Sequence, residues 1–126
     1  MNENFISTEG GNISISEEVI SVISAIAAKE VEGLASMGGT LLGGLGDILA
    51  KKNQGKGVKV EFTEAGLVID VHITVMFGVK IREVSISIQE HIKNAVETMA
   101  GLNVNVVNVF VDGVELEKAK TNEVSE

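Results

Sequence analysis

The sequence predicts an α+β fold, in which helices pack on one face of a small mixed sheet of about four strands in β-α-β-β-α-β order. Three observations support this prediction. Residues 80–100 place apolar side chains at helical spacing and lead directly into a valine-rich strand. Residues 58–62 and 67–75 alternate apolar and polar side chains around a short turn, which is typical of a β-hairpin. A further segment, after Ser16, is apolar over most of a helical circumference.

The N-terminal part is predicted to contain a short strand followed by a helix. Residues 12–15 alternate polar and apolar side chains, which favours a strand. Ser16 is a good N-cap residue, and Glu17 and Glu18 place carboxylates at the positive end of the helix dipole. The helix is expected to pack on more than one side, because its apolar residues surround it, and Gly33 is a suitable C-terminal stop.

Residues 34–57 differ in character, because seven glycines are interspersed with leucines and other apolar residues. The apolar positions keep a helical spacing, yet each interior glycine costs a helix about 1 kcal/mol relative to alanine. The segment is therefore expected to be mobile, with a short helix that is capped by Thr40 or Asp47 and ends near Lys52.

The last helix and the last strand each contain an irregularity. Ile86 lies about 140 degrees around the helix from Ile81 and so falls off the apolar stripe; it is either an ordinary exposed residue or part of an association surface. In the strand, the apolar alternation changes phase between Val106 and Val107. This change predicts either a β-bulge near that point or a strand that is buried on both faces.

The expected organisation is one domain. Residues 1–10 are expected to form a flexible N-terminus, residues 11–116 the domain, and residues 117–126 a disordered acidic tail. The chain contains no cysteine, so disulfide and thiol chemistry are excluded. No signal-like or bilayer-spanning apolar run is present, and a cytoplasmic protein without cofactors is expected.

The net charge of −8 argues against general nucleic-acid binding, but four of the ten basic residues fall close together. This cluster is either a solvated loop or a docking surface for an acidic partner or anionic headgroups. Leucines precede it, as in segments that fold on a partner surface. The candidate docking residues are Lys51, Lys52, Lys56, Lys59, Leu41, Leu45 and Ile86.

Two other functions have weak support in the sequence. Asp70 and His72 project from one face of a strand, and with His91 and Glu90 they form the only plausible catalytic or metal-binding set; we expect no convergence and assign no catalytic or metal residue. Residues 43–46 match the GxxG loop of KH domains, but the acidic chain has no tyrosine or tryptophan for base stacking. Nucleic-acid binding therefore remains a remote alternative.

Several short motifs together resemble the alkaline shock protein family of Gram-positive bacteria. They include an Ile-Ser-Glu-Glu-Val-Ile helix start, a Lys-Gly-Val-Lys-Val strand and an Ile-Gln-Glu then Ala-Val-Glu-x-Met helix. The matches fall in residues 11–20, 30–33, 56–60, 88–90, 95–99, 101–104, 107–109 and 113–114. No single motif is specific, but their combination over nearly the whole chain is.

The resemblance implies a nonenzymatic role in cell-envelope stress or homeostasis. The implied mechanism is self-association, as a homo-oligomer, together with binding to a membrane-anchor protein. An alternative implied by the resemblance is a regulatory module that controls fatty-acid synthesis enzymes such as acetyl-CoA carboxylase. The valine-rich last strand and the broadly apolar first helix are the expected self-association surfaces, with Val107, Val109 and Val111 as candidate residues in the strand.

Overall fold

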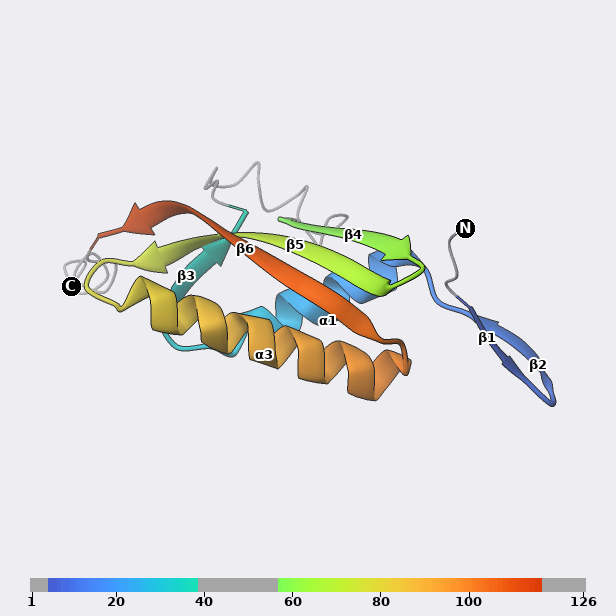
Figure 1. The fold of residues 1–126 in the computed structure, drawn as a ribbon. Helices are drawn as coiled ribbons and strands as arrows, with labels where there is room; N and C mark the ends of the chain where they lie inside the picture. The colour runs from blue at the N-terminus through green and yellow to red at the C-terminus, as the bar shows by residue number, and fades with distance from the viewer. Residues whose placement is uncertain (1–4, 39–56, 117–126) are drawn as a thin grey trace, which may run out of the picture.

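The computed structural model describes residues 5–38 and 57–116, and it has the predicted α+β architecture. Strands β3 to β6 form a four-stranded sheet, and the two described helices pack together against one face of it (Figure 1). A separate β1–β2 hairpin projects from one end of this body. The elements are β1 (Phe5–Thr8), β2 (Gly11–Ser14), α1 (Glu17–Lys29), β3 (Leu34–Met37), β4 (Val58–Thr63), β5 (Gly66–Met76), α3 (Ile81–Ala100) and β6 (Val104–Glu115).

The long strand β5 organises the sheet. On one edge it pairs antiparallel with β4 along its first half and with β3 near its end, so that β3 and β4 lie end to end. On its other edge it pairs in parallel with β6 over almost its full length. The sheet is therefore mixed, as predicted, and β6 is an edge strand within the described part of the chain.

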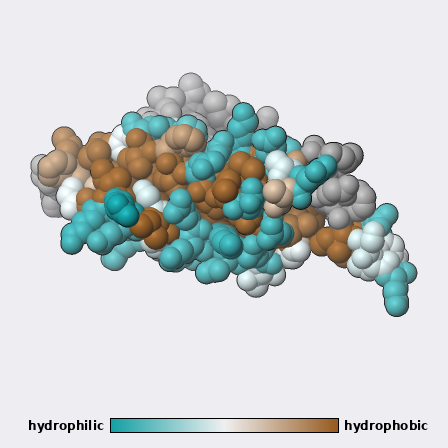
Figure 2. Space-filling view, in the orientation of Figure 1, coloured by the Kyte–Doolittle hydropathy of each residue, from teal (hydrophilic) through white to brown (hydrophobic). Residues whose placement is uncertain are grey.

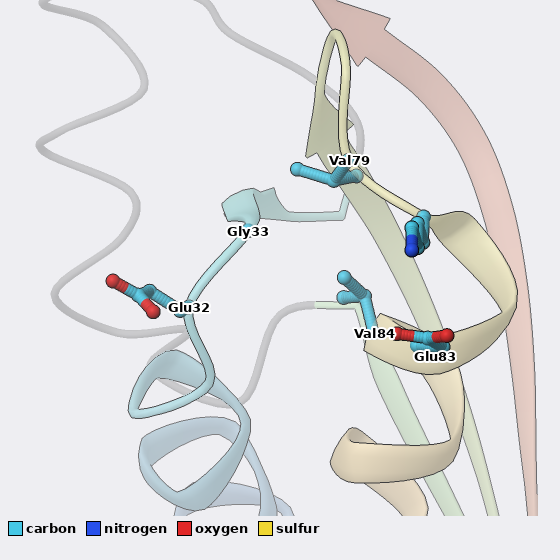
Figure 3. A pocket seen from close by; sticks show the side chains of 6 residues that line it. Glu32, Gly33, Val79, Glu83 and Val84 are labelled. Atoms are coloured by element: carbon cyan, nitrogen blue, oxygen red, sulfur yellow. The ribbon is translucent and has the colours of Figure 1, made fainter.

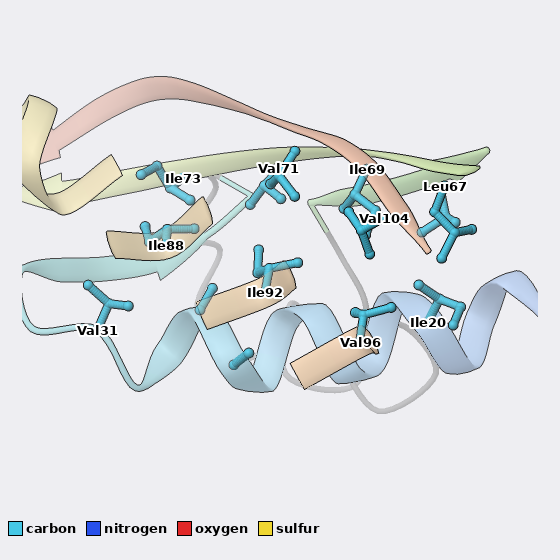
Figure 4. Close-up of a cluster of buried hydrophobic side chains, with 14 of the residues drawn as sticks. Ile20, Val31, Leu67, Ile69, Val71, Ile73, Ile88, Ile92, Val96 and Val104 are labelled. Atoms are coloured by element: carbon cyan, nitrogen blue, oxygen red, sulfur yellow. The ribbon is translucent and has the colours of Figure 1, made fainter. Parts of the chain in front are cut away.

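The hydrophobic core fills the space between β5 and the two helices (Figure 4). Alternate residues of β5 point toward the helices, because successive side chains of a strand lie on opposite faces. The predicted apolar stripe of α3 faces these residues, and α1, which packs beside α3, contributes further apolar side chains to the same core. The fully buried apolar side chains include Ile20, Ile69, Val71, Ile73, Val75, Ile88, Ile92 and Val96.

The predicted helix ends are largely confirmed. Ser16 is the N-cap of α1, and its hydroxyl accepts a hydrogen bond of 3.2 Å from the backbone N–H of Val19. Gly101 ends α3 in the left-handed conformation, with φ of 71°. Helix α1 ends at Lys29, earlier than the predicted stop at Gly33. Gly33 has a φ of 104° and lies in the turn that follows.

Two predictions for the N-terminal half were wrong. The strand predicted at residues 12–15 belongs to the hairpin, where β2 pairs with β1, and not to the main sheet; β1 falls in residues expected to be flexible. Residues 34–37 were expected to be mobile or helical, but they form β3. Pairing of β3 with the end of β5, and packing of Leu34 and Met37 against the core, outweigh the weak local preference.

The phase change in the last strand is explained by a β-bulge. The register of β6 against β5 shifts twice, with Asn105 and Asp112 as the extra residues. The first bulge lies next to the predicted position. Between the bulges, Val107 is buried and Val109 and Val111 pack against the core, whereas Val106 and Phe110 are exposed.

Candidate interaction surface

The face of the sheet opposite the helices carries rows of side chains that run across three strands. In one row, Lys59 of β4 lies beside Asp70 of β5, which lies beside Asn108 of β6. The amide Nδ2 of Asn108 donates a 2.9 Å hydrogen bond to Oδ1 of Asp70. Lys59, a predicted docking residue, is exposed on this open face, so the structure supports its accessibility.

The next row centres on His72. Its ring stacks on Phe110 with centroids 4.8 Å apart, and its Nδ1 lies 2.8 Å from Oδ2 of Asp112. Asp112 is the extra residue of the second bulge in β6. Both partners of the His72–Asp112 pair are nearly half exposed, at 44% and 45%. A side-chain pair this exposed stabilises a fold by at most about 1 kcal/mol, so it is better suited to orienting side chains on this surface.

The catalytic set considered from sequence does not assemble. His72 and Asp70 lie on the open face, whereas α3, which carries His91, packs against the opposite face. The ring of His91 instead lies 2.9 Å from the carbonyl oxygen of Ser87, one turn earlier in its own helix. Among the described residues, no group of three or more His, Cys, Asp or Glu side chains could hold a metal ion.

The free edge of β6 is covered at its beginning by side chains of α3. Oε2 of Glu97 accepts a 2.9 Å hydrogen bond from the N–H of Val104, and Nε2 of Gln89 donates a 3.0 Å bond to the carbonyl of Val107. Since backbone groups of successive strand residues point to alternate sides, Val109 and Val111 also direct their N–H and C=O groups to this edge. No described residue bonds to them there.

A hydrophobic strip follows the same strand on the surface. Figure 2 shows apolar side chains gathered along β6, above the hydrophilic surface of α3. Among the described apolar residues of β6, the most exposed are Val106, Phe110 and Val114, at 40%, 43% and 48%. Val106 and Phe110 share the open face of the sheet, whereas Val114 lies beside Val75. The valines of this strand were predicted as candidates, whereas Phe110 and Asp112 were not. The sequence feature that could have identified them is the presence of an aromatic residue and a carboxylate in an otherwise valine-rich strand.

The remaining predicted docking residues are only partly described. Ile86 is 41% exposed on α3, as its position off the stripe indicated. Leu41, Leu45, Lys51, Lys52, Lys56 and the short helix predicted among them lie outside the described residues.

The residues on either side of segment 39–56 are nevertheless fixed at one point of the sheet. The N–H of Gly38 donates to the carbonyl of His72, and the N–H of His72 donates to the carbonyl of Gly57, each at 2.8 Å. The two residues that flank the segment, Gly38 and Gly57, therefore both lie at the edge of β5 opposite to β6.

A small pocket of about 260 Å³ lies where the turn after α1 meets the first turn of α3 (Figure 3). Gly33 brings the two elements together, because a Cβ atom there would lie 2.9 Å from a methyl group of Val84. Two valine side chains and three charged groups surround the hollow. Its lining residues are Glu32, Gly33, Val79, Lys80, Glu83 and Val84.

Of the helices described, none is long and apolar enough to cross a membrane.

Comparison with known proteins places the chain in a family. A sequence model of the alkaline shock protein 23 family, which is described by a cell envelope-related function, matches residues 6–116. Uncharacterized protein YqhY of Bacillus subtilis (strain 168) is 40% identical over 120 residues, covering 94% of this chain and 89% of that protein. Uncharacterized protein Spy1614 of Streptococcus pyogenes serotype M6 is 35% identical over 113 residues, covering 88% and 93%.

Among solved structures, a MamM-CTD variant is similar with a TM-score of 0.47 and 13% sequence identity, covering 78% of this chain and 98% of that one. This similarity is too weak to carry information on function. The family match and the two relatives confirm the resemblance predicted from the sequence motifs. The protein therefore belongs to the alkaline shock protein 23 family, whose function is related to the cell envelope.

Proposed function

We propose that this protein is a nonenzymatic component of cell-envelope homeostasis that associates with copies of itself and docks to a membrane-anchor partner. The observation that carries the proposal is the free edge of β6. At Val109 and Val111 this edge presents backbone hydrogen-bonding groups that no described residue uses, beside an exposed hydrophobic strip. Such an edge is a ready template for a strand from another chain.

The composition of the edge supports association. Natural proteins protect exposed edge strands with lysine, proline, short strands or covering side chains. Here Gln89 and Glu97 cover the first half of β6 but leave the second half open. The six residues 106–111 are Val, Val, Asn, Val, Phe and Val, without a charge or a proline. A long, uncharged edge of this kind is suited to pairing.

Docking to an anchor protein is proposed for the opposite side of β5. Lys59 is exposed on the open face, and Lys51, Lys52 and Lys56 lie in or at the end of a segment that leaves and rejoins the sheet at His72. In a chain with a net charge of −8, this local excess of positive charge favours an acidic partner surface.

Affinity capture from cytoplasmic and membrane fractions of the native cell tests the docking step. The parent protein is expected to recover a small membrane protein, and a variant with four lysines changed to glutamate should lose it. These lysines are Lys51, Lys52, Lys56 and Lys59. A matched control makes the same change in net charge at exposed residues of the helices and the α3 entry, namely Lys29, Lys80, Arg82 and Lys93.

The control variant is expected to recover the membrane protein as the parent does. Equal loss in both variants would indicate a general effect of charge and would contradict docking through the basic segment. Recovery of soluble fatty-acid synthesis enzymes, without a membrane protein, would instead support the regulatory alternative. Sedimentation velocity of the purified parent tests self-association separately, because it requires no partner.

A further inference from the structure

We propose that the uncovered half of the β6 edge receives the β1–β2 hairpin of a second copy of this chain, so that copies join head to tail. This inference rests on the proposed self-association and names the two surfaces that make it. The receiving surface is the edge at Val109 and Val111. The inserted surface is a hairpin whose two strands, among the described residues, pair only with each other.

The receiving surface has a defined length. Between the bulges at Asn105 and Asp112, residues 106–111 pair with β5 without interruption. Within this regular stretch the hydrogen bond from Gln89 occupies Val107, which leaves the backbone groups of Val109 and Val111. A strand of four residues is long enough to pair with both positions, because outward-pointing residues recur at every second place.

The hairpin has the properties of the missing strand. Each of its strands is four residues long, and none of their eight residues is charged. All residues of β2 are exposed. An isolated two-stranded hairpin is at best marginally stable in water. Addition of the hairpin to a third strand would satisfy one of its two free edges and cover apolar side chains such as Ile13, which is 51% exposed.

The positions of the two surfaces favour a second copy. The hairpin projects beyond the end of the body where β6 begins, and the uncovered half of β6 runs toward the opposite end (Figure 1). From Val104 to Val109 alone, five residues of strand span about 17 Å. Only Ile15 and Ser16 connect β2 to α1, and two extended residues reach about 7 Å. In the structure a chain's own hairpin lies beyond the start of β6, away from this stretch, which favours insertion into a second copy.

Electrostatics favour the hairpin over a second copy of β6. In an antiparallel pair of two β6 strands centred on Val111, Asp112 of each chain would lie opposite Phe110 of the other, so that the two Asp112 residues would be diagonal neighbours across the strands. Glu115 would add further negative charge at the ends. Like charges near each other across strands are destabilising. The uncharged hairpin avoids this repulsion, and its contact is between two different surfaces, which yields chains or rings of copies and not closed pairs.

Two proline variants separate the surfaces. Val109→Pro removes an N–H that points to the free edge, so the ladder with β5 should remain intact. In the hairpin, Thr8 and Gly11 flank a two-residue turn and form a hydrogen-bonded pair, so Ile6 and Ile13 form the next one. Ile13→Pro therefore removes a bond within the hairpin, while the core, to which the hairpin does not contribute, is unchanged.

The experiment is sedimentation velocity of the full chain over a range of concentrations. The parent is expected to associate, and each variant alone should sediment as a monomer of 13.3 kDa. An equimolar mixture of the two variants should form a complex of twice this mass. Such a complex is expected because one variant keeps a working edge and the other keeps a working hairpin. The complex cannot grow further, because its remaining edge carries Val109→Pro and its remaining hairpin carries Ile13→Pro.

Other outcomes overturn the proposal. If Ile13→Pro associates as the parent does, the hairpin is not the inserted element, although self-association itself would stand. If the mixture of two monomeric variants stays monomeric, the surfaces are not complementary. A monomeric parent would remove both this proposal and the self-association on which it rests.

Controls guard against loss of folding and against another interface. Circular dichroism melts establish that each variant is folded, and Val111→Pro replaces Val109→Pro if that variant is not. Ile26→Ser changes an apolar residue that is 55% exposed on α1, a helix that packs on α3, β4 and β3 and belongs to neither proposed surface. It is expected to associate like the parent, and its loss of association would contradict the proposed contact.

Discussion

Substitution of Gly57 by alanine should destabilise the fold more than the same change at Gly78. Both glycines have left-handed φ angles, 86° and 100°, so a side chain is strained at either position. This strain costs about 1 to 3 kcal/mol. At Gly57, however, an added Cβ would lie 2.6 Å from the backbone nitrogen and 2.8 Å from the Cα of Gly38, whereas at Gly78 nothing lies within 4 Å.

The contact at Gly57 cannot relax by rotation of a side chain, because the obstructing atoms belong to the backbone. Relief requires separation of the two chain segments that are hydrogen-bonded to His72. Overpacking of this kind typically costs a further 1 to 3 kcal/mol, roughly. Gly57→Ala should therefore lose about 2 to 6 kcal/mol of unfolding free energy, and Gly78→Ala only the backbone part.

Urea unfolding followed by circular dichroism measures both losses. The difference between the two variants is the informative quantity, since the backbone strain is common to them. Equal destabilisation would refute the conclusion that segment 39–56 leaves and rejoins the sheet at one crowded point.

Three further predictions concern the stability of the body, each measured by urea unfolding. Ile92→Ala, at a side chain with no exposure, should cost about 2 to 5 kcal/mol, whereas Ile86→Ala, at 41% exposure on the same helix, should cost much less; similar losses would contradict the assigned core. Ser16→Ala removes the N-cap of α1 and should cost about 0.5 to 2 kcal/mol, and Ser16→Asn should restore most of it. Asp112→Asn should change the stability by less than about 1 kcal/mol, because its contact with His72 is nearly half exposed; a larger loss would show that the pair has a structural role.

Sequence patterns predicted those parts of the fold in which local and tertiary preferences agree. The stripe of α3 and the alternation of β4 and β5 are long periodic signals, and each element forms where they place it. Strand β3 shows the limit of such signals. Its four residues carry little local preference, and they become a strand because β5 extends beyond β4 and offers an unpaired edge. Only the assembled sheet contains that information.

The candidate surface was predicted in part for a similar reason. The repeated valines of the last strand indicated an unusual element, but whether its edge is free depends on which strand pairs with it. Gln89 and Glu97 are ordinary polar residues in the sequence, and their role in covering the edge follows only from the packing of α3 beside β6. The His72–Asp112 pair likewise depends on the second bulge of β6, which the sequence did not predict.

The arrangement of the sheet bears on whether the two proposed activities can coexist. Pairing through β6 would use the free edge of the sheet on one side of β5. Gly38 and Gly57, which flank the basic segment, lie on the other side of β5. A chain joined to others through β6 would therefore keep its docking side accessible. If both proposals hold, copies joined head to tail would present one basic segment each. An anchor partner would then bind an assembled protein with higher avidity than a monomer, because several segments are held at high effective concentration.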